Sequence, residues 1–500
     1  MSRMRPLTMA AVIVAGLLAG SPPRQRITFT RDVAPILYRH CAACHRPDGA
    51  APFALLRYED AGPRAGLIAA AMASGRMPPW LPEPGDVVFA GERRASRAEI
   101  DVVRRWAELG APRGDPALLP PAPSWPAAGG WQLGEPDLIV DFPAYTVPPD
   151  GVDRYRNLVA AAPVTSPRWV RAVEIRPGSP RVVHHARLMV DTTASSRRAA
   201  ASDGMALETG AINPPGFFVG WTPGKAAAPH PDGSAWPLAP GTDLVLQVHV
   251  RPHGSSEVIR PRVGLSFAGA PPVRRTALVI LGTKTIDIAP GDSAHVVTDT
   301  FALPVPVLAL GVYPHAHYLA TRMDAWARLP DGRTRWLLRI ARWDFNWQDE
   351  YRYATPIELP AGSVVGMRYT YDNSTANPRN PSSPARRVTY GPQSTDEMAD
   401  LVLQVALRRP DQVATLERDL RWKYYAEQVA WEAYRAYAAG RDHAAAGRLD
   451  SAVARFRESL SLRADDPRVH HALGMALAAQ GQAGEAKAHF EQAARLARPQ

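Results

Sequence analysis

The chain has 500 residues, which at about 150 residues per domain suggests roughly three domains. Hydrophobic residues make up 46% and charged residues 21%, so the composition is that of a folded globular protein and excludes a disordered chain or a multi-span membrane protein. Lys and Arg number 58 against 48 for Asp and Glu, giving a net charge of +10. Only four of the 58 are lysine and no basic run carries interleaved aromatics, so we expect no nucleic-acid binding.

Residues 1–21 have the pattern of an export signal. Arg3 and Arg5 precede the apolar stretch Ala10–Leu18, which is followed by the small residues Ala19–Ser21. The stretch is shorter than the roughly 18 apolar residues of a spanning helix, so cleavage is favoured over a retained anchor. The sequence therefore predicts a periplasmic or secreted protein.

The region 27–113 is predicted to be a small all-α domain. Apolar residues recur at helical spacing in Arg31–Tyr38, Ala65–Ala73 and Arg97–Leu109, the pattern of short amphipathic helices. Residues 114–135 are rich in proline and are predicted to form a semi-rigid linker.

From residue 136 to 410 the hydrophobic pattern changes to a period of two. It is clearest in Thr242–Val250 and Val364–Tyr371, and Pro330–Gly332 separates two such runs as expected for a hairpin. Many short strands over this length predict two tandem all-β sandwiches, at 136–268 and 269–410.

The segment 422–500 is predicted to be helical and repetitive. Equivalent residues recur after 34 positions: Gly447 and Gly481, Ala452 and Ala486, Phe456 and Phe490. A helix-turn-helix period of 34 residues is typical of tetratricopeptide repeats. About two repeats are present. This segment is expected either to bind a protein partner or to cap the C-terminal end of the fold.

Cys41 and Cys44 are the only cysteines and stand in the pattern Cys-Ala-Ala-Cys-His that ends at His45. Two thiols followed by histidine form the attachment motif of covalently bound haem c, with the histidine as axial iron ligand. A redox dithiol and half of a zinc site are the alternatives. Met77 is the predicted sixth ligand, and Met72, on a helical apolar face, is its competitor. The segment resembles the small c-type cytochrome domains fused to other exported bacterial proteins.

The β region contains a group of residues that suit copper. They are the adjacent pair His184 and His185, His249, the pair His315 and His317, and Met398. Residues at i and i+2 share a face of a strand, whereas adjacent histidines need a bulge or twist to share a metal. Imidazoles with one thioether suit copper in both oxidation states. His253 is the main rival to His249.

Four stretches in this region carry a family resemblance. Arg181–His185, Leu246–His249, Pro314–Leu319 and Gly391–Met398 occur in the same order as in the copper type II, ascorbate-dependent monooxygenases. That family includes dopamine β-monooxygenase and peptidylglycine α-hydroxylating monooxygenase. The chain resembles this family over about residues 136 to 410.

The resemblance implies two jelly-roll domains that each hold one copper ion and face each other across a solvent-filled cleft. It implies that His184, His185 and His249 hold an electron-transfer copper, and that His315, His317 and Met398 hold the copper that activates O₂. Gln247 also matches a glutamine of the family. The implied reaction is hydroxylation of a C–H bond, which needs O₂ and two electrons.

The chain departs from the animal members of the family in two ways. Its β region has no cysteine, so disulfides do not brace it. The fused haem segment is expected to supply electrons in place of ascorbate, and an electron-donor protein or another reductant is an expected partner. The substrate is expected to be a small or peptide-like molecule. Four residues lie near the segments of the second copper set in the sequence and are candidates for the substrate pocket: Arg322, Tyr369, Tyr371 and Asn373. An ordinary structural role is the alternative for each.

Two other functions fit the same residues. One is a haem and copper electron-transfer or copper-carrying protein without oxygenase activity. The other is a partner-binding scaffold that docks through the C-terminal repeats. Intact ligand positions at all six candidate copper residues favour a working metal protein.

Overall fold

The computed structural model describes residues 26–497, apart from 48, 86, 126–129, 152, 201–208 and 231–232. The expected export signal and part of the expected linker lie outside the described residues. The chain divides into two compact units, of which the smaller comprises Met1–Ala42, Ala54–Met77 and Ala95–Pro123. The larger comprises Ala43–Phe53, Pro78–Arg94 and Ser124–Gln500.

The smaller unit is built from short helices. They are η1 (Phe29–Val33), α1 (Ala34–His40), α2 (Tyr58–Ala61), η2 (Gly62–Arg64), α3 (Ala65–Ala73), α4 (Arg97–Glu108) and η3 (Pro116–Leu118). Ser96 and Glu99 form a capping box that starts α4, because each side chain satisfies a backbone N–H that the first turn leaves free. Trp106 is fully buried and its ring lies 6.0 Å from that of Phe29. The expected short helices are present in this region.

The first part of the β region forms two four-stranded sheets and one two-stranded sheet. The sheet orders are β1-β10-β4-β7, β3-β8-β5-β6 and β2-β9, all antiparallel. The strands are β1 (Leu138–Asp141), β2 (Tyr145–Val147), β3 (Arg154–Ala161), β4 (Arg168–Arg176), β5 (Val183–Asp191), β6 (Val219–Trp221), β7 (Trp236–Leu238), β8 (Asp243–Val250), β9 (Glu257–Ile259) and β10 (Arg262–Ala268), with helix α5 (Ser195–Ala200) after β5. One core of buried side chains joins the two larger sheets.

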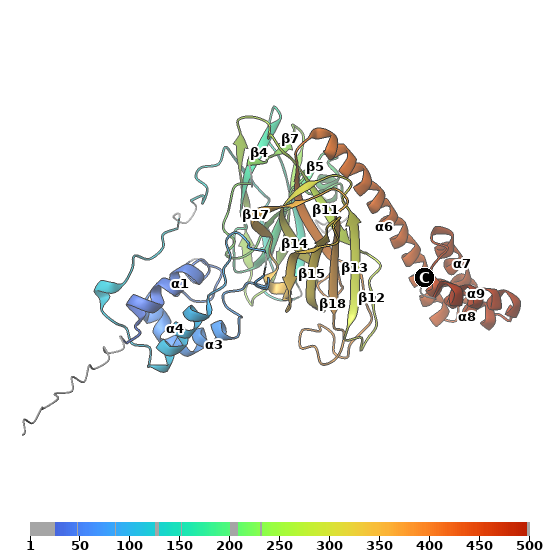
Figure 1. The fold of residues 1–500 in the computed structure, drawn as a ribbon, viewed down its shortest axis with the longest axis horizontal. Coiled ribbons are helices and arrows are strands. Elements are labelled where there is room, and N and C mark those ends of the chain that lie inside the picture. The colour runs from blue at the N-terminus through green and yellow to red at the C-terminus, as the bar shows by residue number, and fades with distance from the viewer. Residues whose placement is uncertain are drawn as a thin grey trace, which may run out of the picture. The chain divides into compact units, whose positions relative to one another are not determined.

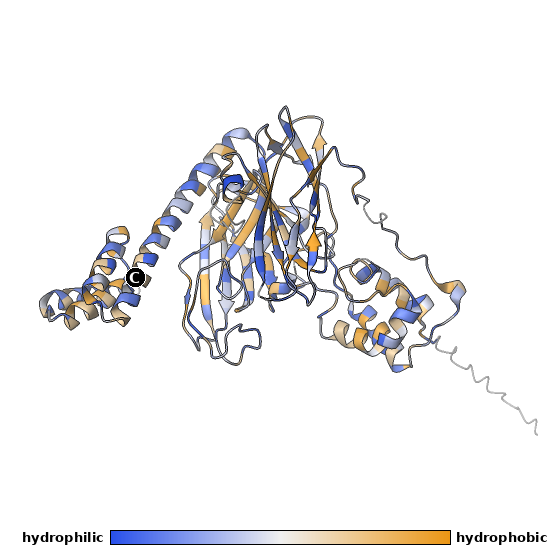
Figure 2. Cartoon of the chain, turned by 180° about the vertical axis from the view of Figure 1, so that it is seen from behind, coloured by the Kyte–Doolittle hydropathy of each residue, from blue (hydrophilic) through white to orange (hydrophobic). Residues whose placement is uncertain are grey.

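The second part repeats this plan, with sheet orders β11-β20-β14-β17, β13-β18-β15-β16 and β12-β19. Its elements are β11 (Arg275–Gly282), β12 (Asp287–Ile288), β13 (His295–Ala302), β14 (Val307–His315), β15 (Ala320–Arg328), β16 (Thr334–Ile340), η5 (Phe345–Trp347), β17 (Tyr351–Leu359), β18 (Val364–Tyr371), β19 (Val388–Thr389) and β20 (Asp400–Leu407). Strands β15 and β16 form the expected hairpin at Pro330–Gly332. The strands carry bands of hydrophobic and hydrophilic residues (Figure 2). The prediction of an all-β region is confirmed, and its sheets are antiparallel.

Four helices follow the last strand (Figure 1). They are α6 (Pro410–Ala445), α7 (Leu449–Leu462), α8 (Pro467–Ala479) and α9 (Ala483–Leu496). Helix α6 starts at Pro410, earlier than the expected Trp422, and its first turns bury Leu416 and Leu420 in the core of the second set of sheets. Within the described residues, no helix has both the length and the apolar character needed to cross a bilayer.

Candidate metal centre

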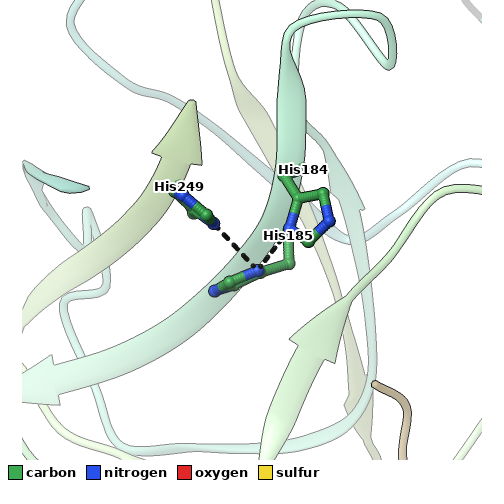
Figure 3. Close-up of side chains that lie close together, drawn as sticks. All are labelled: His184, His185 and His249. Atoms are coloured by element: carbon green, nitrogen blue, oxygen red, sulfur yellow. Dashed lines mark hydrogen bonds between the residues drawn. The ribbon is translucent and has the colours of Figure 1, made fainter. Parts of the chain in front are cut away.

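The first histidine set lies on two neighbouring strands. His185 on β5 is directly opposite His249 on β8, and the register between these strands shifts between Val183 and His185. A register shift of this kind re-aims a side chain, which is the condition that adjacent histidines need to share a metal. Figure 3 shows the rings of His184, His185 and His249 gathered in one place.

The three imidazoles converge through their Nδ1 atoms. His185 Nδ1 lies 3.2 Å from His184 Nδ1 and 3.4 Å from His249 Nδ1 (Figure 3). One candidate ligand atom from each of the three residues lies within 4.8 Å of the other two. Three nitrogen atoms at such spacing, each with a lone pair when it is unprotonated, fit a single transition-metal ion.

Burial keeps His184 and His185 neutral. It lowers the pKa of His184 to about 4 and that of His185 well below its ordinary value, and the neighbouring histidines add to both effects. Their lone pairs are therefore free for a metal at neutral pH. The Asp153 carboxylate lies 3.2 Å from His249 Nε2, on the side of the ring away from the converging Nδ1 atoms. Tyr155 stacks on His249 at 4.3 Å.

The second pair, His315 and His317, differs from the expected strand pair. His315 is the last residue of β14, but His317 lies in the loop that follows, so the two do not share the face of one strand. Their ring centroids are nevertheless 5.2 Å apart with the ring planes at 83°. A turn at the end of the strand brings the rings together where strand periodicity does not.

Hydrogen bonds fix how these two rings are presented. The Nδ1 atom of His317 donates to the carbonyl oxygen of Asp396 at 3.0 Å, and that of His315 donates to Gln348 Oε1 at 2.7 Å. Because a carbonyl oxygen only accepts, both rings carry their proton on Nδ1 and leave Nε2 as a ligand atom. Burial lowers the pKa of His317 to about 3.

Glu397 joins Met398 to this pair. Its Oε2 atom accepts hydrogen bonds from the backbone N–H groups of His317 at 2.9 Å and Met398 at 3.2 Å, and Oε1 accepts from Leu319 at 2.7 Å. The carbonyl oxygen of Met398 accepts from Tyr371 at 2.8 Å. The backbone of the third candidate ligand is therefore held beside the histidine pair. Sequence reasoning missed Glu397, although an acidic residue next to a candidate ligand was a signal.

The two sets are connected through buried side chains. Gln348 lies 2.7 Å from His315 Nδ1 through Oε1 and 3.4 Å from His185 Nδ1 through Nε2. The ring of Phe345 lies 5.8 Å from that of His184 and 5.4 Å from that of His317. Gln348 is 2% exposed and Phe345 1%. The solvent-filled cleft that the resemblance implied is not found at these residues, because Gln348 and Phe345 occupy the space between the sets.

Other candidates have structural roles. Gln247 donates to Asn157, and His253, the rival to His249, lies 3.3 Å from Glu257 instead of joining the histidine set. Of the candidate pocket residues, Arg322 pairs with Asp324, Tyr369 donates to the carbonyl of Asp400, Tyr371 donates to that of Met398, and Asn373 donates to three carbonyls, those of Ile288, Ala289 and Arg386. These contacts account for the polar groups without a substrate.

The haem motif follows helix α1. Cys41 is buried in the smaller unit, whereas Cys44 and His45 belong to a segment assigned to the larger unit, and neither cysteine is in a disulfide. His45 Nδ1 donates to the carbonyl oxygen of Phe53 at 3.0 Å, which leaves Nε2 for an axial bond to iron. Met72 is 2% exposed in the core around α3, while Met77 is partly buried just beyond that helix. This burial agrees with a core role for Met72.

Comparisons with known proteins assign no family. No family model matches the chain and no curated protein matches its sequence. Among solved structures, the major capsid protein P2 of bacteriophage PM2 is 10% identical, with a TM-score of 0.23 over 54% of this chain and 97% of that one. A Paenibacillus xanthan lyase is 13% identical, with a TM-score of 0.16 over 58% of this chain and 28% of that one. Scores this low carry no argument about function.

Proposed function

We propose that this protein is an exported copper-dependent monooxygenase that hydroxylates a C–H bond of an organic substrate with O₂. The observation that carries the proposal is the convergence of three imidazole Nδ1 atoms beside a second histidine pair that is hydrogen-bonded through Nδ1. The proposal includes the finer assignments of tandem jelly rolls, a cytochrome c-like haem segment and C-terminal tetratricopeptide repeats.

The donor sets suit two copper ions with different tasks. Neutral imidazoles bind copper in both oxidation states, and a thioether favours Cu(I). His184, His185 and His249 would hold one ion, and His315, His317 and Met398 the other. Bound copper would supply one-electron transfer at the first set and reduction of O₂ at the second.

The surrounding residues prepare these ligands. At the second pair, Gln348 and the Asp396 carbonyl decide which ring nitrogen carries a proton. At the first set, the Asp153 carboxylate faces His249 Nε2. Such partners orient the imidazole and raise its basicity as a ligand. The chain itself therefore selects Nε2 at the second set, whereas at the first set it gathers the three Nδ1 atoms.

Hydroxylation needs two electrons, and one c-type haem holds one. Cys41 and Cys44 would form the thioether bonds to haem, His45 would bind iron through Nε2, and Met77 would be the sixth ligand. Electrons would then come from the fused haem in place of ascorbate, supplied in turn by an external reductant or a donor protein.

The first test is the metal and haem content of the protein matured in a periplasm that attaches haem. We expect about two copper ions per covalent haem, one for each ligand set. A His253→Ala variant is the matched control, because this histidine lies outside both sets and its loss should not change copper content. Protein with covalent haem and no tightly held copper would overturn the proposal.

The role of Met398 gives a sharper prediction. Met398→Ala removes the only thioether of the second set, so we expect loss of hydroxylation and of one copper ion, with the first copper and the haem retained. Copper content, the haem spectrum and substrate-dependent O₂ uptake together measure this. Unchanged turnover in the variant would contradict the assignment of the second set.

A second candidate is a haem and copper electron-transfer protein without oxygenase activity. It is favoured by Phe345 and Gln348, because buried side chains stand between the sets where a substrate cleft was expected. This protein would show copper-dependent oxidation of the haem but no O₂ uptake when candidate substrates are added. The same O₂ measurement therefore separates the two functions.

A further inference from the structure

The side chain of Gln348 reaches one histidine set with its amide oxygen and the other with its amide nitrogen. It follows the turn η5 in the second group of sheets and is 2% exposed. Its Oε1 atom accepts from His315 Nδ1 at 2.7 Å and from the Tyr313 hydroxyl at 3.1 Å. Its Nε2 atom lies 3.4 Å from His185 Nδ1.

At the second set, Gln348 selects the ligand atom. Oε1 has no proton to give, so His315 must donate from Nδ1 and keep its Nε2 lone pair. Without this acceptor the ring could place its proton on either nitrogen or rotate. Loss of such an outer partner typically costs a metal site about 10- to 100-fold in affinity.

At the first set, the amide of Gln348 competes with a metal. The Nε2–H group faces the same His185 Nδ1 atom on which His184 and His249 converge. A cation bound to that lone pair would repel the amide hydrogens and attract the amide oxygen. Turning the amide toward the cation would withdraw Oε1 from His315.

We infer that Gln348 couples the two sets, so that a metal ion bound at His184, His185 and His249 weakens metal binding at His315, His317 and Met398. The inference rests on the proposed copper assignment, but it concerns the linkage of the two sites and not the reaction that they perform. Gln348 is a positioning residue in this scheme, since it acts through the histidines.

The test is anaerobic titration with Cu(I) against a competing chromophoric chelator. His249→Ala disrupts the first set and leaves the second intact, and Met398→Ala does the reverse. The Cu(I) dissociation constant of each variant is compared with the two constants of the whole protein. We expect Cu(I) at one site to raise the dissociation constant of the other site by about 5-fold or more, which is within the usual range of site coupling. Gln348→Leu should reduce this factor at least threefold and lower the affinity of the second set by about 10- to 100-fold.

Two further variants keep the test decisive. Gln348→Glu retains an acceptor for His315, so it should restore the affinity of the second set that Gln348→Leu loses. Gln404→Leu is the matched control, because Gln404 is also buried and donates to the carbonyl of Gly216 without touching either histidine set. It should leave both constants and their coupling unchanged.

The inference is overturned if Gln348→Leu leaves the second-set affinity and the coupling within twofold of the whole protein, or if Gln404→Leu has the same effect as Gln348→Leu. Absence of Cu(I) binding at both sets would overturn it together with the proposed function. Coupled Cu(I) binding without any hydroxylation would remove only the proposed function. Hydroxylation with independent Cu(I) sites would remove only the coupling.

Discussion

Glu397 is a fully buried carboxylate at the second histidine pair. Burial raises its pKa to about 8, although backbone N–H groups of His317, Leu319, Met398 and Ala320 donate to it and favour the charged form. These bonds tie the loop after β14 to the segment before β20. The geometry of the second set therefore depends on a residue that is not itself a ligand.

Glu397→Gln should loosen this connection. The amide offers one acceptor oxygen in place of two and turns an N–H group toward backbone donors, so we expect a loss of about 1–3 kcal/mol in the free energy of unfolding. Chemical denaturation measures this, and copper content should fall at the second set only. Glu358→Gln is the control, since Glu358 is 73% exposed in its pair with Arg408. Equal stability of the two variants would contradict the role of Glu397.

His230 is a buried histidine outside both sets. Its ring lies 4.2 Å from that of Phe217, and its Nε2 atom has no hydrogen-bond partner among the described residues. Burial lowers its pKa to about 3; nearby Arg352 lowers it further and Glu350 opposes this. The folded protein therefore holds His230 neutral under conditions in which the unfolded chain would protonate it.

This shift predicts acid sensitivity. Folding lowers the pKa of His230, so between pH 6.5 and about 3 the unfolded chain binds a proton that the folded protein does not. The free energy of unfolding is therefore unaffected by His230 above pH 6.5 and decreases as the pH falls from 6.5 toward 3. At pH 5 the loss is about 2 kcal/mol. Denaturation at pH 7 and pH 5 should show a smaller difference for His230→Gln than for the unmodified protein. An equal difference in both would refute the prediction.

At the residue scale, the sequence identified the candidate ligands but not the residues that hydrogen-bond to them. Motif spacing brought forward His184, His185 and His249, which do converge. Gln348 lies outside the four stretches that carry the resemblance, and Glu397 lies inside one only as the neighbour of Met398. Their contacts reach His185 and His317 across 163 and 80 positions of sequence. Only the folded chain brings such pairs together, so periodicity and local spacing do not reveal them.

At the scale of single elements, the C-terminal helices show a repeated contact. Phe456 on α7 packs against Gly440 on α6, and Phe490 on α9 packs against Gly474 on α8. A Cβ atom at Gly440 would lie 2.5 Å from the ring of Phe456, and one at Gly474 would lie 2.8 Å from that of Phe490. Glycine at these positions lets each helix pair approach closely.

Gly440→Ala should therefore destabilise the C-terminal helices despite the better helix propensity of alanine. Crowding against Phe456 is expected to cost about 1–3 kcal/mol. Gly484→Ala on α9 is the matched control, because nothing lies within 4 Å of its added Cβ, and it should be neutral or stabilising by up to about 1 kcal/mol. Hydrogen exchange in α6 and α7 measures the effect. Slower exchange in Gly440→Ala would show the contact to be wrongly assigned.

Elements were predictable where local pattern decides the structure. Alternation of hydrophobic residues identified Val364–Tyr371 as a strand, and β18 has these bounds. The start of α6 was not predicted, because its first turns pack on the sheets. Leu416 and Leu420 belong to the same hydrophobic core as the buried side chains of β20. His317 was wrongly placed on a strand, since β14 ends at His315 and alternation does not mark where a strand stops.

For the whole molecule, α6 belongs to the second group of sheets as much as to the terminal helices. Lys423 Nζ lies 2.6 Å from Asp299, and Arg441 lies 2.8 Å from Asp287. The Tyr424 hydroxyl accepts from the backbone N–H of Ile280 at 3.3 Å. A domain boundary at 422 would therefore cut through a helix that completes the core.

Truncated chains should show that the sheets depend on α6 and not on the helices that follow it. A chain that ends after Ala446 keeps all of α6 and should fold and bind copper as the whole protein does. A chain that ends after Arg409 loses the burial of Leu416 and Leu420, worth about 3–6 kcal/mol together, and should unfold at lower denaturant. Tryptophan fluorescence follows the transition in each. Equal stability of the two chains would show that α6 is dispensable to the sheets.

Under the proposed function, the position of the first histidine set within its sheet bears on electron transfer. Strands β5 and β8 are the two inner strands of the order β3-β8-β5-β6. Strand β8 is paired on both sides at His249, and β5 is paired with β6 over Ala186–Leu188, directly after its two histidines. Inner strands open only when much of a sheet unfolds, and the ligand nitrogens are already gathered by the backbone. A metal ion there would change oxidation state with little rearrangement of its ligands. The second set, built from a strand end and two loops, has more freedom to change its coordination.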